Sequence, residues 1–206
     1  MTNIQRFHDF AQLFTRLVKQ VGDDEARIFE EGKKLLADLT LYDDWLPEEF
    51  AQSDPDWYQQ YLLYCDPWER FSVVSCVWDP GQGTPVYDLT IWGMIGVLRG
   101  SLACTRYTEE AGGYQWMAEY PQHLEPGQVF VASPSIGDVH KVSNALGDRT
   151  SVSVHVYGLN IAGAKRYVYD VQTGQRKKFT TSYSNPVIAR ITQSRLKVLL
   201  NRIKEL

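Results

Sequence analysis

The stretch that decides the fold is GQGTPVYDLTIWGMIGVLRG, residues 81–100. Its second half contains the apolar segment 94–98, which ends at the turn signal Arg99-Gly100 and therefore predicts a buried strand. In its first half, Tyr87 and Leu89 lie two positions apart, so on a strand both side chains point to one face. Asp88 lies between them and is expected to point the opposite way. The stretch thus predicts extended chain that directs two side chains into one interior.

The same pattern continues on both sides of this stretch. Strand-like segments occupy residues 71–78, 94–98, 102–107, 114–120, 128–132, 139–142, 150–157 and 166–169. Turn residues separate them, for example Gly112-Gly113 and Pro126-Gly127. Many short strands without intervening helices predict an antiparallel sandwich or barrel.

Helical patterns lie at the two ends of the chain. Residues 4–21 carry apolar side chains at spacings of three and four, and a second such pattern follows Asp23 and Asp24. Short helical turns are expected at residues 47–50 and 56–64. Residues 190–206 form a third amphipathic pattern, which we expect to pack on the barrel or on a second subunit to make a homodimer.

Length and charge narrow the class of protein. The chain has 206 residues, of which 44% are hydrophobic, which suits one domain. Within it we expect a helical portion at 1–65, a β-barrel at 66–185 and a C-terminal helix at 186–206. A formal net charge of -4 gives no broad basic face, so nucleic acid is not an expected partner.

The sequence also bears on the compartment. No apolar run reaches the eighteen residues that would span a bilayer, so no membrane association is expected and a cytoplasmic location is predicted. The three cysteines, Cys65, Cys76 and Cys104, lack metal-binding or redox spacing. We expect them to be buried free thiols.

Two motifs give the chain a resemblance to the cupins. In residues 81–100, Gly81, positions 87 and 89, and Gly100 have the spacing of the first cupin motif, whose two inner positions hold histidines. The second motif is matched at PSIGDVHKVSN, residues 134–144, with His140 at the third inward ligand position. The resemblance implies a mainly β fold, a double-stranded β-helix or jelly-roll-like barrel, with N-terminal helices and a C-terminal helix added.

Over essentially its whole length the chain resembles the thiol dioxygenases, the cysteine and 3-mercaptopropionate dioxygenase branch of the cupins. Four stretches carry this likeness: QYLLYCDPWERFSVVS, TIWGMIGVLRG, GDVHKVSNA and SVSVHVYGLNI. The resemblance implies that Ser153, His155 and Tyr157 form the relay that orients substrate and dioxygen. It also implies that Gln60 holds the substrate carboxylate, and that the substrate is a small thiol oxidised to a sulfinate.

The metal site departs from the family pattern. The resemblance implies iron held by three inward histidines, but here Tyr87 and Leu89 replace two of them beside His140. A mononuclear non-haem iron needs three facial protein ligands, and a leucine offers none. Tyr87 would bind ferric iron only as a phenolate, which requires the metal to remove its proton. At the position of a further ligand or crosslinking cysteine stands Gly93, so no thioether to Tyr157 forms.

These residues leave several functions open. An enzyme would act on a small thiol carboxylate with a metal held by Tyr87, His140 and a further group, with a different metal, or by metal-free acid–base chemistry. Alternatively, the barrel is a binding module for a small acid or thiol. A third hypothesis is a structural homologue that regulates an active paralogue by co-assembly.

Overall fold

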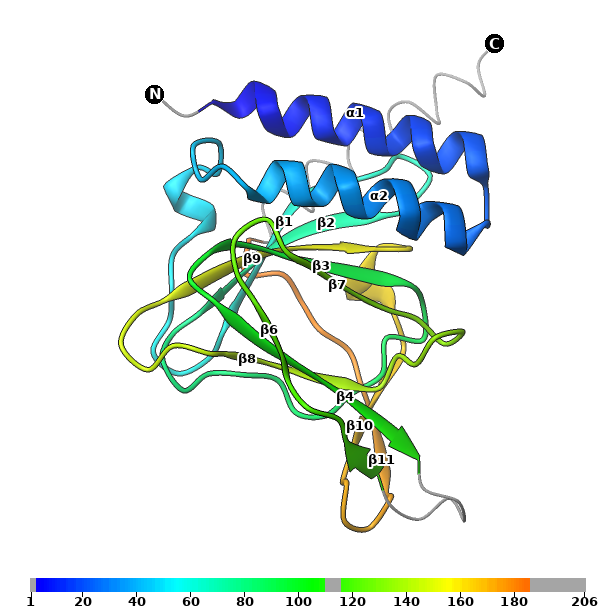
Figure 1. Cartoon of the computed structure of the whole chain (residues 1–206), viewed down its shortest axis with the longest axis vertical. Coiled ribbons are helices and arrows are strands. Elements are labelled where there is room, and N and C mark those ends of the chain that lie inside the picture. The colour runs from blue at the N-terminus through cyan, green and yellow to red at the C-terminus, as the bar shows by residue number, and fades with distance from the viewer. Residues whose placement is uncertain (1–2, 110–115, 186–206) are drawn as a thin grey trace.

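Two antiparallel sheets face each other in the computed structural model of the chain, which describes residues 3–109 and 116–185. The helices α1 (Ile4–Val21) and α2 (Glu25–Thr40) lie together over the outer face of one sheet (Figure 1). Single 3₁₀ turns occupy Glu48–Phe50 and Ile161–Gly163. The strands are β1 (Gln59–Cys65), β2 (Ser72–Trp78), β3 (Gly93–Arg99), β4 (Leu102–Glu109), β5 (Trp116–Ala118), β6 (Gln122–Leu124), β7 (Val129–Ala132), β8 (His140–Asn144), β9 (Ser151–Tyr157), β10 (Arg166–Tyr169) and β11 (Arg176–Phe179).

The order of the strands is that of a jelly roll. The first sheet runs β1-β2-β9-β3-β7; in the second, β4 pairs with both β6 and β8. Backbone hydrogen bonds between Tyr87 and His140 add the segment before β3 to the second sheet. Between β2 and β9, the chain therefore crosses from one sheet to the other at every connection between strands, except the connection from β4 to β6. The predicted mainly β fold, a cupin-type double-stranded β-helix with N-terminal helices, is confirmed.

Helix α1 covers the first sheet because its apolar residues form one stripe. Phe7, Phe10 and Phe14 are buried, as the spacing predicts, and α2 begins at the side chain of Asp24, which accepts the Arg27 amide hydrogen. This layer forms one hydrophobic cluster with the sheet face that it covers, and a second cluster fills the interior of the barrel.

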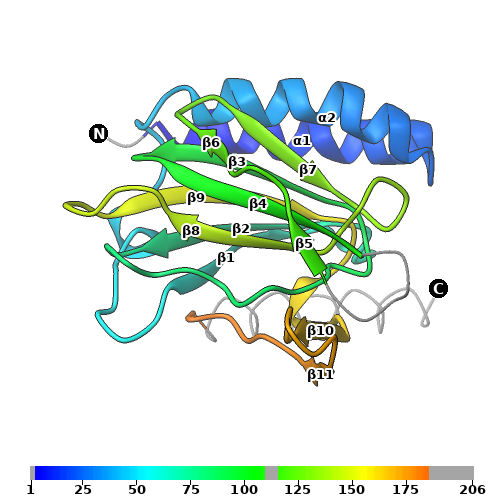
Figure 2. The same ribbon diagram turned by 60° about the horizontal axis from the view of Figure 1, so that its bottom comes forward.

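The β10–β11 hairpin lies away from the helices, on the far side of the barrel (Figure 2). Its two strands pair with each other, and β10 joins the barrel through the segment that contains Tyr87. The amide of Asp88 donates to the Tyr167 carbonyl, and the Tyr169 amide donates to the Val86 carbonyl. The hairpin thereby closes one side of the barrel mouth.

Some local predictions were wrong. Residues 59–65 form strand β1 instead of the helical turns predicted at 56–64, because their backbone pairs along β2 and this tertiary pairing decides the conformation. The helical N-terminal portion therefore ends before residue 65, and β1 belongs to the first sheet. Strands β6 and β11 were not predicted. The predicted turn near residues 47–50 is confirmed, as are the three buried free cysteines.

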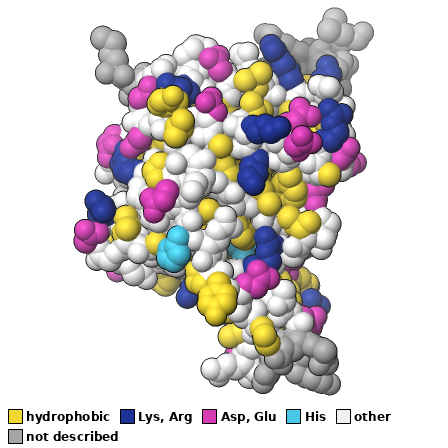
Figure 3. All heavy atoms as spheres, in the orientation of Figure 1, with side chains coloured by type: hydrophobic (Ala, Val, Ile, Leu, Met, Phe, Trp, Pro, Cys, Tyr) yellow, Lys and Arg dark blue, Asp and Glu magenta, His cyan; other side chains and the backbone are white. Residues whose placement is uncertain are grey.

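Two predictions concern parts that the structure describes incompletely. The expected C-terminal segment 186–206, with its helix at 190–206, lies outside the described residues. Of the strand predicted at 114–120, the structure describes β5. Within residues 3–109 and 116–185, no helix has the length and apolar character required to cross a membrane. Basic and acidic side chains are interspersed on the face seen in Figure 3.

Candidate functional site

A small pocket opens into the interior of the barrel beside the β10–β11 hairpin. The space between its atoms, including the mouth, is about 330 Å³. Its lining comes from β1, β2, β9, the segment before β3, and the hairpin. The lining residues are Tyr58, Gln60, Cys76, Trp78, Thr84, Pro85, Tyr87, His155, Tyr157, Arg166 and Phe179. No aspartate or glutamate is among them, so the pocket wall carries no fixed negative charge.

Three of the predicted site residues form a hydrogen-bonded chain on β9. Ser153, His155 and Tyr157 alternate along the strand and point to the barrel side. Ser153 Oγ lies 2.8 Å from His155 Nε2, and His155 Nδ1 lies 2.8 Å from the Tyr157 hydroxyl oxygen. All three side chains are buried, while His155 and Tyr157 line the pocket. The relay predicted from the sequence is therefore present as a connected set of groups.

Burial keeps these groups uncharged at neutral pH. It lowers the pKa of His155 to about 3 and that of His140 to about 4. Burial also raises the pKa of the Tyr157 and Tyr87 hydroxyls well above the usual value near 10. A general acid or base works best with a pKa near the working pH, and none of these four groups has one.

Arg166 brings a positive charge into the pocket. It begins β10 and is only 2% exposed, with its guanidinium over the rings of Phe179 and Tyr87, whose centroids lie 4.7 and 5.7 Å from Cζ. One terminal nitrogen donates to the hydroxyl of Thr181, while Nε has no hydrogen-bond partner. Among the described residues no carboxylate pairs with it. A buried cation without a counterion destabilises the fold, so binding of an anion beside Arg166 is favourable.

Gln60 offers a second free donor in the same pocket. It lies on β1 opposite Cys76 of β2 and is buried, and its side-chain Nε2 has no hydrogen-bond partner. Its backbone, in contrast, is tied to Ser184 by two hydrogen bonds. The structure therefore places the predicted carboxylate-binding residue in the pocket with an unused amide donor.

The predicted metal position is occupied by packed side chains. Tyr87 and His140 are backbone partners, and their ring centroids are 4.7 Å apart. His140 Nδ1 contacts the carbonyl of Asp138, but its Nε2 is buried without a partner. Leu89 is buried in the same hydrophobic cluster as Tyr87, behind the pocket wall. As expected, Asp88 points the other way, accepting from the Tyr167 amide and the Tyr169 hydroxyl.

These donors do not fit the iron that the resemblance implies. Within the described residues, no three or more His, Cys, Asp or Glu side chains converge on a point where a metal could bind. His140 Nε2 is buried without a partner, Leu89 has no donor atom, and burial raises the pKa of the Tyr87 hydroxyl, which therefore keeps its proton. A three-ligand iron site would require different residues at positions 87 and 89.

Leu89 packs against the backbone of Gly93, at the start of β3. A Cβ added to Gly93 would lie 2.6 Å from Leu89 Cδ1 and 3.3 Å from Tyr157 Cδ1. Gly93 is also the backbone partner of Tyr157 on β9. The leucine thus fills the space that a side chain at position 93 would need, so the two replacements in the first motif depend on each other.

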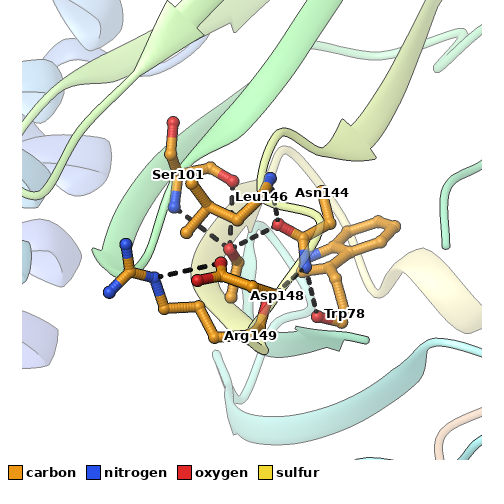
Figure 4. A network of polar contacts seen from close by, with 7 residues as sticks. Trp78, Ser101, Asn144, Leu146, Asp148 and Arg149 are labelled. Atoms are coloured by element: carbon orange, nitrogen blue, oxygen red, sulfur yellow. Dashed lines mark hydrogen bonds and ion pairs between the residues drawn. The ribbon is translucent and has the colours of Figure 1, made fainter. Parts of the chain in front are cut away.

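Asn144 of the second motif has a structural role. Its side chain links the end of β8 to the start of β9 and to β2 (Figure 4). Nδ2 donates to the carbonyls of Trp78 and Arg149, both at 2.9 Å, and Oδ1 accepts from the Leu146 amide and the Ser151 hydroxyl. The asparagine therefore holds the turn between the strands and fixes the backbone of Trp78.

Arg166 was not predicted to be a site residue, although the sequence contains a pattern that indicates it. It lies two residues before Val168 in a predicted strand, and alternation places both on the face that meets Tyr87. A basic residue that shares a strand face with an apolar residue is expected to point into the interior. Tyr58 and Phe179 gave no such signal, because the strand or loop that carries each was not predicted.

Comparison with known proteins returns cupin barrels. No family model matches the chain. Similar solved structures include a conserved protein with a double-stranded β-helix domain from Klebsiella pneumoniae, with 19% identity, 59% of this chain and 86% of that chain covered, and TM-score 0.44. Others are an RmlC-like cupin from Desulfovibrio desulfuricans (22%, 52% and 89%, 0.39) and a cupin 2 conserved barrel domain protein from Rhodopseudomonas palustris (16%, 59% and 75%, 0.42). Such TM-scores assign no function, and the strand order itself identifies the barrel.

Proposed function

We propose that the barrel binds a small organic anion through Arg166 and Gln60. The observation that carries this proposal is the buried guanidinium of Arg166, which lines a pocket without acidic residues and has no carboxylate partner in the described part of the chain. A bound carboxylate would neutralise the cation and accept hydrogen bonds from its Nε and from Gln60 Nε2. The space that a molecule can reach in the ligand-free pocket is only about 20 Å³, about that of one water molecule, so the ligand must be small and the lining side chains must move apart to admit it.

A thiol carboxylate is the class of ligand that the sequence resemblance supports. His155 and Tyr157 of the hydrogen-bonded chain line the pocket, and the thiol end of such a molecule would lie against them. Oxidation of that thiol is not part of this proposed function, because positions 87 and 89 supply no imidazole. The pKa values of His140, His155 and Tyr157 do not suit these three groups to acid–base catalysis at neutral pH.

Isothermal titration with matched ligands tests the proposal. Propionate and 3-mercaptopropionate are expected to bind, whereas the uncharged propionamide is not. Arg166→Met should weaken propionate binding at least about tenfold, because a charge-assisted hydrogen bond is lost. Arg99→Met is the control, since Arg99 pairs with Asp43 at the surface. Equal binding of acid and amide, or unchanged binding by Arg166→Met, would contradict the proposal.

Restoring the missing imidazoles tests the choice of ligand. The variant Tyr87→His/Leu89→His, supplied with ferrous iron, should hold the metal and consume oxygen when 3-mercaptopropionate is added. Wild-type protein treated identically serves as the reference. If the variant binds iron but oxidises neither 3-mercaptopropionate nor cysteine, a thiol carboxylate is the wrong ligand class.

A further inference from the structure

Four buried side chains form a continuous chain of hydrogen bonds that ends at the pocket. The first is Trp78, whose Nε1 lies 2.9 Å from Ser153 Oγ. The Ser153–His155–Tyr157 chain described above continues from there. All four side chains are at most 3% exposed. Hydroxyl and imidazole groups both donate and accept, so the distances among these three leave the direction of the chain undetermined.

The indole of Trp78 restricts the direction in which the hydrogen bonds can run. An indole N–H only donates, so Ser153 Oγ must accept from Trp78. The single hydroxyl hydrogen of Ser153 then has one remaining partner within reach among the described side chains, His155 Nε2. If Ser153 donates to Nε2, His155 carries its proton on Nδ1 and donates it to the oxygen of Tyr157. The Tyr157 hydrogen is left to point into the pocket.

The opposite direction leaves a buried donor unpaired. In that arrangement His155 Nε2 and Trp78 both donate to Ser153, and the hydroxyl hydrogen of Ser153 has no acceptor. Ser153 is fully buried and does not line the pocket, so neither solvent nor a ligand reaches that hydrogen. An unpaired buried donor is costly, whereas the free hydrogen of Tyr157 faces a space that a ligand enters.

We infer that Trp78 sets the direction of this chain, so that Tyr157 presents its hydroxyl hydrogen to the ligand. Trp78 is thus a positioning residue that acts through Ser153 and His155. Together with donors on Arg166 and Gln60, this hydroxyl would give a deprotonated acid group three hydrogen-bond donors in the pocket. The choice of ligand rests on the proposed function, but the direction of the chain does not.

Other contacts hold Trp78 where it can act in this way. Asn144 Nδ2 donates to its carbonyl, as Figure 4 shows, and the ring of Tyr58 stacks on the indole with centroids 4.5 Å apart. His155 stays neutral because burial lowers its pKa to about 3, so it carries one proton on a defined nitrogen. The Tyr157 hydroxyl stays protonated because burial raises its pKa.

The tautomer of His155 tests the inference directly. ¹⁵N-detected NMR of the ligand-free wild-type protein at neutral pH distinguishes a protonated Nδ1 from a protonated Nε2. We expect His155 to be protonated on Nδ1. A spectrum with the proton on Nε2 would overturn the inference, whatever the protein binds.

A pair of tryptophan variants tests the role of the indole. In Trp78→Phe the smaller ring leaves space for a water molecule, which can accept the Ser153 hydrogen, so an Nε2-protonated population of His155 should appear and propionate binding should weaken. Trp45→Phe is the matched control, because Trp45 is equally buried and donates to the Leu39 carbonyl at 2.9 Å in the helical layer. An unchanged tautomer in Trp78→Phe, or the same shift in Trp45→Phe, would contradict the assigned role.

Tyr157→Phe measures the donor at the end of the chain. Loss of a hydrogen bond to a charged group should weaken propionate binding by about tenfold. Unchanged affinity would show that Tyr157 does not donate to the anion. If wild-type protein binds no anion at all, the proposed function fails, but protonation of His155 on Nδ1 would still establish the direction of the chain.

Discussion

Strand β9 has two faces that are equally buried but differ in chemistry. Val152, Val154 and Val156 belong to the hydrophobic cluster under the helices, and the buried polar residue opposite Val154, Ser75, donates to the Phe50 carbonyl. Residues Ser153, His155 and Tyr157 point into the barrel. The three buried side-chain atoms that lack partners within the described residues, on Gln60, His140 and Arg166, all belong to the barrel side. We infer that the helical layer supplies stability, while the barrel keeps polar groups available for a ligand.

Truncating the helical layer should have the largest effect. Phe14 is fully buried and packs against Phe71, the residue before β2, with ring centroids 4.9 Å apart. Phe14→Ala is expected to lower the free energy of unfolding by about 3–5 kcal/mol, since it creates a cavity in an apolar core. Urea denaturation measures this change. A loss below about 1 kcal/mol would remove the distinction between the two faces.

Acid should lower the free energy of unfolding through two histidines on the barrel side. The pKa values of His140 and His155 are about 4 and 3 in the folded protein, against about 6.5 when unfolded. Below pH 6.5 the unfolded chain therefore binds more protons, and the free energy of unfolding falls as the pH is lowered. The slope approaches about 1.4 kcal/mol per pH unit for each histidine, and these two groups add no slope well above pH 6.5.

Denaturation at a series of pH values between 6.5 and 5 measures that slope. His155→Gln should remove the contribution of one imidazole. His8→Gln is the control, because His8 is exposed on α1 and should leave the slope unchanged. Stability that is independent of pH in this range would contradict the burial of neutral imidazoles.

The pairing of Leu89 with Gly93 predicts a smaller effect. Gly93→Ala should cost about 1–3 kcal/mol, because the new methyl group overlaps the leucine side chain. In a Leu89→Ala background, the same substitution should cost much less. Denaturation of the two single variants and the double variant gives the coupling energy, and additive losses would mean that the two positions are independent.

Removing the pocket cation should change the stability least, and unlike the other changes it should not destabilise the protein. Arg166→Met deletes a buried charge that no carboxylate neutralises in the described residues, so stability should stay equal or rise by about 1 kcal/mol. Thermal unfolding without ligand measures this. A large loss of stability would assign Arg166 a structural role instead of a binding role.

The sequence was most informative where local patterns determine structure. The stripe at residues 4–21 predicted α1 with its observed bounds, and the alternation in 150–157 predicted β9 within a residue. It failed at β1, where the leucines and tyrosines of residues 59–65 have no clear period and only pairing with β2 fixes the strand. Short edge strands such as β6 and β11 likewise depend on their partners.

Part of the site could also be predicted from local patterns in the sequence. The spacing of the two motifs identified the positions of Tyr87 and His140, and His155 was assigned through the resemblance. Gln60 was assigned through the resemblance, and the pocket contains it. Whether a buried donor has a partner is a property of the assembled fold, so the unpaired state of Arg166 could not be read from the sequence.

The position of Arg166 on the β10–β11 hairpin has a practical consequence. The cation and Phe179 are supplied by a pair of strands that is appended to the barrel and contacts it through the segment near Tyr87. Exchanging residues 166–179 for another hairpin of equal length that keeps the backbone hydrogen bonds to Val86 and Asp88 would alter the charge at the entrance. Under the proposed function, the choice of anion would therefore depend mainly on this hairpin, which could be exchanged to change the ligand.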